Sequence, residues 1–325
     1  MQIDPRHLVH FATIIEEGSF SGAAEKLGTS QPALSTMVKA LEARTGLTLL
    51  SQRRRPVLPT EAGRELATKG QGIRNLLDEA DRDTEETRKG KIGALRIGAP
   101  SFFCEHVLAE RIISFRRKRP KVGFDIQTGY NLDLHRKVEN CEIDMAFGPI
   151  TADLAGARTH RQEMVSFGHI IVCRADHPLM KKQKVTLKDL QAADWISHSS
   201  ESALFQVMQA ELNRLGVTAL GNAIKSNSAS ALMQLLHNTD CLSVLPVFSV
   251  LPSLQEGKLK IIKLRHRLPE VAFGLITQKH YSPTPLAEQF IAHVEAGLIE
   301  INNKTAGIDM ELEPEQREDR SSNLD

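Results

Sequence analysis

The stretch from Ser19 to Arg44 carries side chains whose types and spacing suit the reading of DNA. At about 100° per residue, a helix that begins near Gln31 places Leu34, Val38 and Leu41 on one side. Short donors and acceptors and one cation occupy the other side: Gln31, Pro32, Ser35, Thr36 and Lys39. Such groups can reach base edges and phosphates in a major groove. The pattern therefore predicts a DNA-reading helix, with an ordinary amphipathic helix pair as the alternative.

The residues before this helix predict a helix-turn-helix. Small and apolar groups at Ala23, Ala24 and Leu27 allow a first helix to approach a second closely, and Gly28 permits a tight turn. Thr29 or Ser30 can cap the second helix, because a side-chain oxygen there accepts from an unpaired backbone N–H. Pro32 then falls in the first turn, where a missing N–H costs little.

The flanking sequence completes a winged domain. Apolar residues at helical spacing predict a helix over residues 4–17 that ends at Gly18, and two short apolar runs at 47–50 and 57–58 predict a two-stranded wing. Arg53, Arg54 and Arg55 lie at the tip of this wing. Between positions 26 and 74 the sequence has nine Lys and Arg residues and three Glu residues, although the net charge of the whole chain is only +1. A solvated charge run is the usual explanation of such a cluster, but here it adjoins the predicted reading helix, where phosphates would lie.

This arrangement resembles the LysR-type transcriptional regulators over nearly the whole chain. The resemblance is most specific at these segments: Gly18-Ser19-Phe20, Ala23-Ala24, Leu27, Ser30 to Ser35, Leu41-Glu42, Gly46 and Thr60 to Gly63. It implies base or backbone contacts from Gln31, Pro32, Ser35 and Thr36, and phosphate contacts from Ser30, Lys39, Arg53, Arg54, Arg55 and Thr60. The family usually has a longer basic or amide run where this chain has Thr36-Met37-Val38. The operator sequence therefore does not carry over.

Residues 60–90 predict one long helix. Leu66, Ile73, Leu77 and Ala80 form an apolar stripe on an otherwise polar segment, and a lone helix of about thirty residues needs a partner. We expect a linker and dimerisation helix, with a solvent-bridging spacer as the alternative. Gly63, Gly70 and Gly72 weaken it as an isolated coiled coil.

After Gly93, strand and helix patterns alternate, which predicts an α/β fold with largely parallel strands. The expected fold class is α/β with an all-α-rich N-terminal winged helix-turn-helix domain (1–59), the linker helix (60–90) and a two-lobed effector domain (92–301). Lobe I comprises residues 92–161 and 268–301, and lobe II residues 162–267, so the chain crosses near Arg161 and Leu268. The family resemblance implies that these lobes form a periplasmic-binding-protein-like domain with a cleft between them.

Ligands in open α/β sheets bind beyond the carboxyl ends of strands and at lobe boundaries. The residues expected to line the cleft follow strands or precede helices: Ser101, Phe102, Phe103, Gly148, Pro149, His198, Ser199, Ser200, Asn227, Ser228 and Pro246. Hydroxyls beside free helix N-termini favour anions, so the predicted effector is a carboxylate. Each serine is equally well explained as a helix cap, and Phe102 and Phe103 equally well as core residues.

The sequence gives little support for an enzyme. It has no Gly-rich phosphate loop, nucleophile elbow or zinc-type histidine pair, so we predict no enzymatic activity, no cofactor and no metal. The four cysteines lack CxxC spacing. Cys104, near a predicted helix start, is the candidate for a lowered thiol pKa, which leaves thiol-based redox sensing as an alternative.

The tail, residues 302–325, has seven carboxylates against three cations and should be disordered. No signal peptide or long apolar span is evident, so we expect a cytoplasmic protein with no membrane partner. The sequence thus predicts an effector-responsive, DNA-binding transcriptional regulator that binds double-stranded DNA as a dimer of dimers (a homotetramer), with RNA polymerase as a further partner that this interpretation allows. A constitutive repressor with an unused cleft, or a ligand-binding protein with a vestigial DNA module, remain alternatives.

Overall fold

The computed structural model describes residues 3–52, 56–88, 93–151, 159–264, 266–279, 281–305 and 308. The chain divides into two compact units. The first comprises residues 1–96, 121–125 and 136–144, and the second comprises residues 97–120, 126–135 and 145–325. The first unit thus holds the N-terminal domain, and most of the two-lobed domain belongs to the second.

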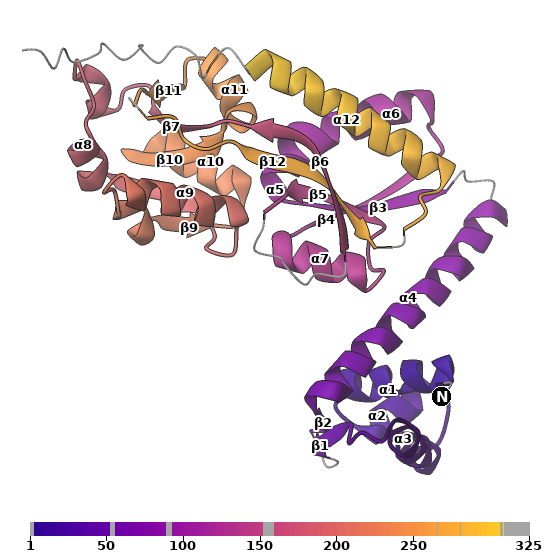
Figure 1. Ribbon diagram of the computed structural model, residues 1–325. Helices are drawn as coiled ribbons and strands as arrows, with labels where there is room; N and C mark the ends of the chain where they lie inside the picture. The colour runs from indigo at the N-terminus through magenta and orange to yellow at the C-terminus, as the bar shows by residue number, and fades with distance from the viewer. Residues whose placement is uncertain are drawn as a thin grey trace, which may run out of the picture. The chain divides into compact units, whose positions relative to one another are not determined.

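The N-terminal domain is a three-helix core. Helices α1 (Pro5–Glu17), α2 (Phe20–Lys26) and α3 (Gln31–Thr45) pack around Phe11, Ile14 and Leu34, none of which is more than 1% exposed (Figure 1). Side-chain oxygens of Asp4, Ser19 and Ser30 cap the three helices in turn. The capping residue of α3 is therefore Ser30 rather than Thr29, and the predicted start near Gln31 is confirmed.

A short hairpin and a long helix complete this domain. Strands β1 (Leu50–Gln52) and β2 (Leu58–Pro59) pair antiparallel as the predicted wing. Helix α4 (Glu61–Arg88) follows, and its first half packs on the N-terminal core through Leu66, Ala67 and Ile73. Leu76 and Leu77 are 52% and 59% exposed, so only part of the predicted apolar stripe is covered within this unit.

Lobe I is built on a five-stranded sheet of order β4-β3-β5-β12-β6. Its strands are β3 (Ala94–Ala99), β4 (Gly123–Thr128), β5 (Met145–Pro149), β6 (Thr159–Phe167) and β12 (Val271–Gln278). Between β3 and β4 the chain forms one helical run, in which α5 (Ser101–Phe103) passes through a π-helical turn (Cys104–Leu108) into α6 (Ala109–Lys118). Helices α7 (Asn131–Glu139) and α12 (Pro285–Thr305) complete the lobe, and α12 packs on α6 and β6.

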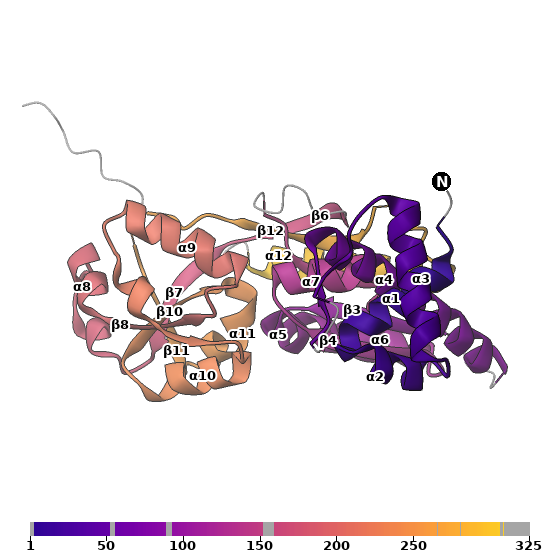
Figure 2. The same ribbon diagram turned by 90° about the horizontal axis from the view of Figure 1, so that it is seen from below.

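Lobe II has a second five-stranded sheet, of order β11-β7-β10-β8-β9. Its strands are β7 (His169–Arg174), β8 (Asp194–His198), β9 (Ile224–Ser226), β10 (Cys241–Pro246) and β11 (Leu259–Ile262). Its helices are α8 (Leu187–Ala192), α9 (Ala203–Arg214), α10 (Ala229–Asn238) and α11 (Val247–Gln255), with 3-10 turns at Pro178–Lys181 and Ala219–Asn222. Figure 2 shows α9 and α10 on opposite sides of this sheet.

Three expectations about this domain need correction. The sheets are mixed: β3–β5, β8–β9 and β8–β10 are parallel, but β7 and β12 each pair antiparallel with both of their neighbours. The first crossing lies at Gly168 and not near Arg161, because Arg161 is the third residue of β6, which stays paired with β12 as far as Phe167. The second crossing falls between β11 and β12, as expected near Leu268. Finally, α12 continues to Thr305, so residues 302–305 are helical rather than part of the tail.

Candidate nucleic-acid interface and effector cleft

Helix α3 presents the polar face that the sequence predicted. Leu34, Val38 and Leu41 are buried, and none of them is more than 1% exposed. On the opposite side Gln31, Pro32, Thr36 and Lys39 are exposed, and Ser35 is half-buried. The helix can therefore offer these side chains to a groove without disturbing its own core.

Two of the predicted phosphate contacts also have internal roles. The Ser30 hydroxyl oxygen accepts from the Ala33 backbone N–H at 3.3 Å, and its own proton is left for another acceptor. The Thr60 hydroxyl accepts from the Gly63 N–H at 3.0 Å and donates to the Thr48 carbonyl oxygen at 2.8 Å. Thr60 thus ties the start of α4 to the wing, while Ser30 keeps a donor for a phosphate.

The basic character of this surface is smaller than the sequence count suggests. Lys26 forms ion pairs with Glu16 and Glu17, and Arg74 forms one with Glu16. The predicted wing residues Arg53, Arg54 and Arg55 lie outside the described residues. Lys39, on the exposed side of α3, is the cation placed beside the polar reading face.

In the second unit the predicted effector residues converge from both lobes. Ser101 begins α5 in lobe I, and its hydroxyl donates to the carbonyl oxygen of Asn227, between β9 and α10 of lobe II, at 3.1 Å. The Phe102 ring lies 5.2 Å from the His198 ring, which ends β8. Gly148 and Pro149 end β5 and are buried, as is Pro246 at the end of β10. The sequence could name these segments but not show that they meet.

Phe102 and Phe103 belong to a cluster of six phenylalanines at the lobe boundary. Its other members are Phe147, Phe167, Phe248 and Phe273. The Phe103 ring stacks on Phe147 and Phe273 and is fully buried, whereas Phe102 touches His198 and Phe248 of lobe II. In this arrangement Phe103 acts as a core residue, and Phe102 packs where the lobes join.

The predicted serines divide between capping and the cleft. Helix α9 is capped by Ser202, whose oxygen accepts from Phe205, so Ser199 and Ser200 are not its capping residues. Ser199 is half-buried and Ser200 exposed. Ser228 caps α10 by accepting from Ala231 at 3.2 Å, and its hydroxyl also contacts that of Ser230. Ser228 is therefore both a cap and a candidate contact at the N-terminus of a ten-residue helix.

His198 has a second buried histidine, His169, beside it. His169 begins β7, and together with Ser197 and His198 it lines a cavity with room for about one water molecule. Burial lowers the pKa of both histidines to about 4. For His169 this is the net result of burial and repulsion from His198, which lower the pKa, and of the Pro269 and Phe167 carbonyls, which raise it. Both rings are therefore neutral at pH 7 and supply no positive charge to a ligand.

Two further polar residues at the cleft escaped sequence reasoning. The Tyr130 hydroxyl, between β4 and α7, donates to the Ser226 carbonyl oxygen at 3.5 Å, so a second lobe I hydroxyl reaches the loop that Ser101 contacts. Asn131 is only 7% exposed, and its Oδ1 has no hydrogen-bond partner among the described residues. Both follow the carboxyl end of β4, which is the position that could have identified them.

The pKa of the Cys104 thiol is shifted in the direction opposite to the one predicted. Burial, followed by the nearby Glu105 carboxylate, raises the pKa of the Cys104 thiol to about 11. Cys104 follows α5 and begins the π-helical turn inside a continuous helical run, so no free helix N-terminus lowers its pKa. The expectation of a lowered pKa was wrong. Within the described ranges, no group of three or more His, Cys, Asp or Glu side chains could hold a metal ion, and no helix is long and apolar enough to cross a membrane.

Two protein-family models match this chain, one over the N-terminal domain and one over the two-lobed domain. Residues 5–64 match the bacterial regulatory helix-turn-helix protein model of the lysR family, and residues 88–298 match the LysR substrate binding domain. The chain belongs to the LysR family of transcriptional regulators. It is a DNA-binding regulator with an effector-binding domain.

Relatives and solved structures agree with this assignment. The chain is 30% identical over 299 residues to the SDS degradation transcriptional activation protein of Pseudomonas sp. (strain ATCC 19151), which covers 88% of this chain and 93% of that protein. It is 26% identical over 289 residues to the HTH-type transcriptional regulator YfeR of Shigella flexneri, which covers 89% and 92% respectively. These relatives are transcriptional regulators.

The fold is shared with ArgP from Mycobacterium tuberculosis (TM-score 0.68, 16% identity), which covers 91% of this chain and 98% of that one. It is also shared with full-length CbnR complexed with its target DNA (TM-score 0.58, 17% identity), which covers 91% of this chain and all of that one.

Proposed function

We propose that a small carboxylate binds between Ser101 of lobe I and the Asn227–Ser228 segment of lobe II. This ligand controls the binding of the regulator to its operator. The observation that supports this most is the hydrogen bond from Ser101 to the Asn227 carbonyl, which brings two predicted effector segments into contact. A ligand bound here would break the hydrogen bond between the lobes and replace it with contacts from each lobe to the ligand. It would then bias the lobe arrangement by its differential affinity for the two states.

The electrostatics at this point favour an anion that is held by dipoles rather than by a salt bridge. The neutral His169 and His198 cannot form an ion pair with a carboxylate. The N-terminal N–H groups of α10 and the hydroxyls of Ser101 and Ser228 can donate to one. Asn131 Oδ1 has no hydrogen-bond partner among the described residues and requires a donor, so the ligand we expect also carries a hydroxyl or amine.

On the DNA side, we propose that Gln31, Pro32, Ser35 and Thr36 contact bases or nearby backbone, while Ser30, Lys39, Thr60 and Arg53 to Arg55 contact phosphates. We further propose that the chain acts in the cytoplasm as a dimer of dimers, in which the exposed Leu76 and Leu77 of α4 meet a second copy. Ligand-driven lobe movement would then change the spacing of paired reading helices and the bend of the DNA, and with it access of RNA polymerase.

The test combines selection and titration. Genomic fragments that the purified full-length protein retains define the operator, and carboxylates and their matched amides are then screened for thermal stabilisation and for a change in operator footprint. We expect a carboxylate to act and its amide to fail. An amide that acts as well as its acid contradicts the anionic site, and a screen without any stabilising compound supports the constitutive repressor instead.

A further inference from the structure

The compact unit that holds the N-terminal domain also holds residues 136–144, at the end of α7 in lobe I. Within this unit the linker helix α4 contacts that turn. The side-chain nitrogen Nδ2 of Asn75, in the middle of α4, donates to the backbone carbonyl oxygen of Asn140 at 2.6 Å. Both residues are half-buried. The contact is therefore a direct hydrogen bond between the helix that leaves the DNA-reading domain and the effector domain.

A series of hydrogen bonds leads from this contact back to the N-terminal core. Gln71 Nε2, one turn earlier on α4, donates to Asn75 Oδ1 at 3.1 Å. The Arg74 guanidinium donates to Gln71 Oε1 at 2.6 Å and to the Glu16 carboxylate of α1 at 2.8 Å. A backbone carbonyl can only accept, so the Asn140 oxygen fixes the orientation of both side-chain amides. Every bond from Arg74 to Asn140 therefore runs from donor to acceptor in one direction.

The turn that receives this bond has a strained backbone. Cys141 has a φ of +57°, and no other non-glycine residue in the described ranges has a positive φ. L-residues rarely adopt this conformation, and it persists where surrounding contacts hold it. Arg96 of β3 donates to the Cys141 carbonyl oxygen at 3.0 Å and forms a nearly buried ion pair with Asp144. Two successive carbonyls of the turn are thus held by different elements, that of Asn140 by α4 and that of Cys141 by β3.

Helix α7 connects this turn to the effector cleft. It is nine residues long, or about 14 Å, and Leu134 and Val138 bury one side of it in the core of lobe I. Tyr130, the residue before it, donates its hydroxyl proton to the Ser226 carbonyl oxygen of lobe II at 3.5 Å. One end of a single helix therefore adjoins the cleft, and the turn at its other end contacts the linker helix.

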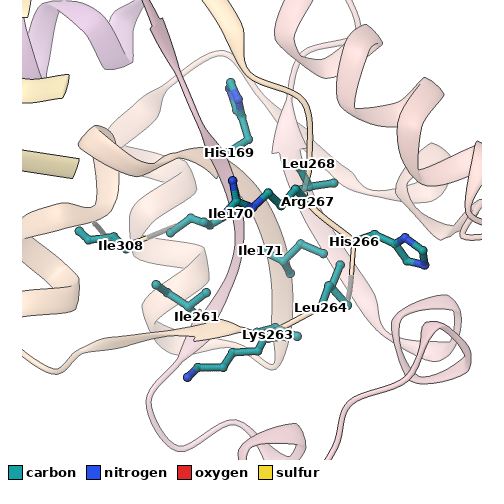
Figure 3. A pocket seen from close by; sticks show the side chains of 11 residues that line it. His169, Ile170, Ile171, Ile261, Lys263, Leu264, His266, Arg267, Leu268 and Ile308 are labelled. Carbon is teal, nitrogen blue, oxygen red and sulfur yellow. The ribbon is translucent and has the colours of Figure 1, made fainter. Parts of the chain in front are cut away.

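A movement of the lobes would reach α7 through this cleft contact. The two crossings of the chain between the lobes lie side by side, because Ile170 at the start of β7 and Leu268 before β12 line the same small pocket (Figure 3). A rotation of lobe II about these paired crossings changes the bonds that Ser101 and Tyr130 make to the loop before α10. The N-terminus of α7 is then held less firmly.

We propose that the hydrogen bond from Asn75 to Asn140 is a latch through which the state of the effector cleft controls the linker helix. Opening of the cleft frees the start of α7, the strained turn relaxes, and the bond to Asn75 is lost. By linkage, loss of the latch favours the open cleft to the same extent. This inference rests on the proposed function, because it takes the boundary between Ser101 and Asn227 as the effector site.

Two isosteric changes open the latch without removing an apolar contact. Asn75→Asp replaces the donor by a second acceptor, and Gln71→Glu makes Asn75 turn its Nδ2 away from the Asn140 carbonyl. In the full-length protein both variants should accelerate deuterium exchange of the backbone amides of residues 141–143 by up to about fivefold, the effect of one neutral hydrogen bond. Asp78→Asn, at an exposed position on the same helix, is the matched control and should change nothing. Unchanged exchange in the first two variants would overturn the latch.

A double variant tests the coupling to the cleft. Ser101→Ala should accelerate exchange at residues 141–143 as well as at 226–231, and Asn75→Asp should do the same. Ser101→Ala combined with Asn75→Asp should show the product of the two effects at both segments, because both bonds then oppose one opening. If each segment responds only to the variant at its own end, the latch is refuted and the effector cleft still stands. A carboxylate screen that fails while the coupling persists would reject the ligand and support the latch.

Discussion

Ser101 and Asn227 stand 126 residues apart in the chain, yet the hydroxyl of the first donates to the carbonyl oxygen of the second at 3.1 Å. With the bond from Tyr130 to Ser226, this contact closes one side of the boundary between lobe I and the loop before α10. Any ligand that enters between these segments must compete with two hydrogen bonds that the protein makes to itself. At this point the two lobes therefore already contact each other directly.

Removing the Ser101 hydroxyl should loosen this closure. A neutral hydrogen bond contributes about 1 kcal/mol, so Ser101→Ala should raise the open population by up to about fivefold. Exchange of the amides of residues 226–231 should accelerate by a similar factor in a deuterium-exchange experiment. Ser200→Ala, at an exposed serine, serves as the control, and equal rates in both variants would show that Ser101 does not hold the lobes.

The glycines of α4 lead to a second prediction. A Cβ at Gly70 would meet the Leu8 carbonyl oxygen at 2.0 Å, and one at Gly63 would meet the Leu49 carbonyl oxygen at 2.0 Å. We expect Gly70→Ala to destabilise the N-terminal domain by several kcal/mol, because α1 must move away from α4. Gly72 offers the matched control, since its added Cβ meets nothing closer than 3.9 Å and alanine there favours a helix by about 1 kcal/mol. Melting temperatures that fall equally in the two variants would contradict this account.

These glycines also show where sequence reasoning fell short. Counted by helix propensity, Gly63 and Gly70 weaken the long helix, and only the approach of α1 and the wing explains their presence. The helix-turn-helix itself was predictable because caps, turn and periodicity are local signals: Ser30, Gly28 and Leu34 each do what their positions indicated.

Long-range pairing was the part that the sequence did not contain. Strand β6, Thr159–Phe167, has no apolar run and exists because β12 lies beside it, so the crossing and the antiparallel strands were misplaced. At the proposed site, the sequence predicted Ser101, His198 and Asn227 from their places after strands. It did not predict Asn131, because an oxygen atom without a hydrogen-bond partner among the described residues becomes significant only when burial removes water.

The reading face of α3 gives a prediction about specificity. Ser35→Ala removes a short donor and acceptor from the exposed side of the helix while leaving the buried leucines in place. Discrimination between the selected operator and a one-base variant should fall by about 1–3 kcal/mol at the affected position, with little change in binding to random duplex. Competition electrophoresis with the two duplexes measures this.

Neutralising the wing arginines should weaken binding to all duplexes and leave base specificity unchanged, in contrast to Ser35→Ala. Replacing Arg53, Arg54 and Arg55 by Gln removes phosphate contacts, so affinity for every duplex should fall and the slope of log affinity against log salt should flatten by about one unit for each lost contact. If instead the wing variant changes base preference and Ser35→Ala changes the salt slope, the two roles have been exchanged.

Cys104 leads to a negative prediction. A thiol with a pKa of about 11 is almost fully protonated at pH 7 and reacts slowly with peroxide. Cys104→Ser should therefore leave operator affinity unchanged before and after peroxide treatment, and mass spectrometry of the treated wild type should find little oxidation at this residue. Peroxide-sensitive binding that disappears in the variant would reinstate redox sensing.

The buried histidines make the stability of lobe II depend on pH in a defined direction. The folded pKa values of His169 and His198, about 4, lie below the ordinary 6.5, so the unfolded chain binds more protons between those limits. Stability is therefore complete above about pH 6.5 and falls as the pH drops toward 4, with a slope of up to about 1.4 kcal/mol per pH unit from each ring. His198→Gln should reduce the slope measured by urea unfolding between pH 6 and pH 5, since glutamine cannot take up the proton. The exposed His160→Gln should not reduce it. Equal slopes in wild type and His198→Gln would mean that water reaches the pair and that the ring already titrates in the folded protein.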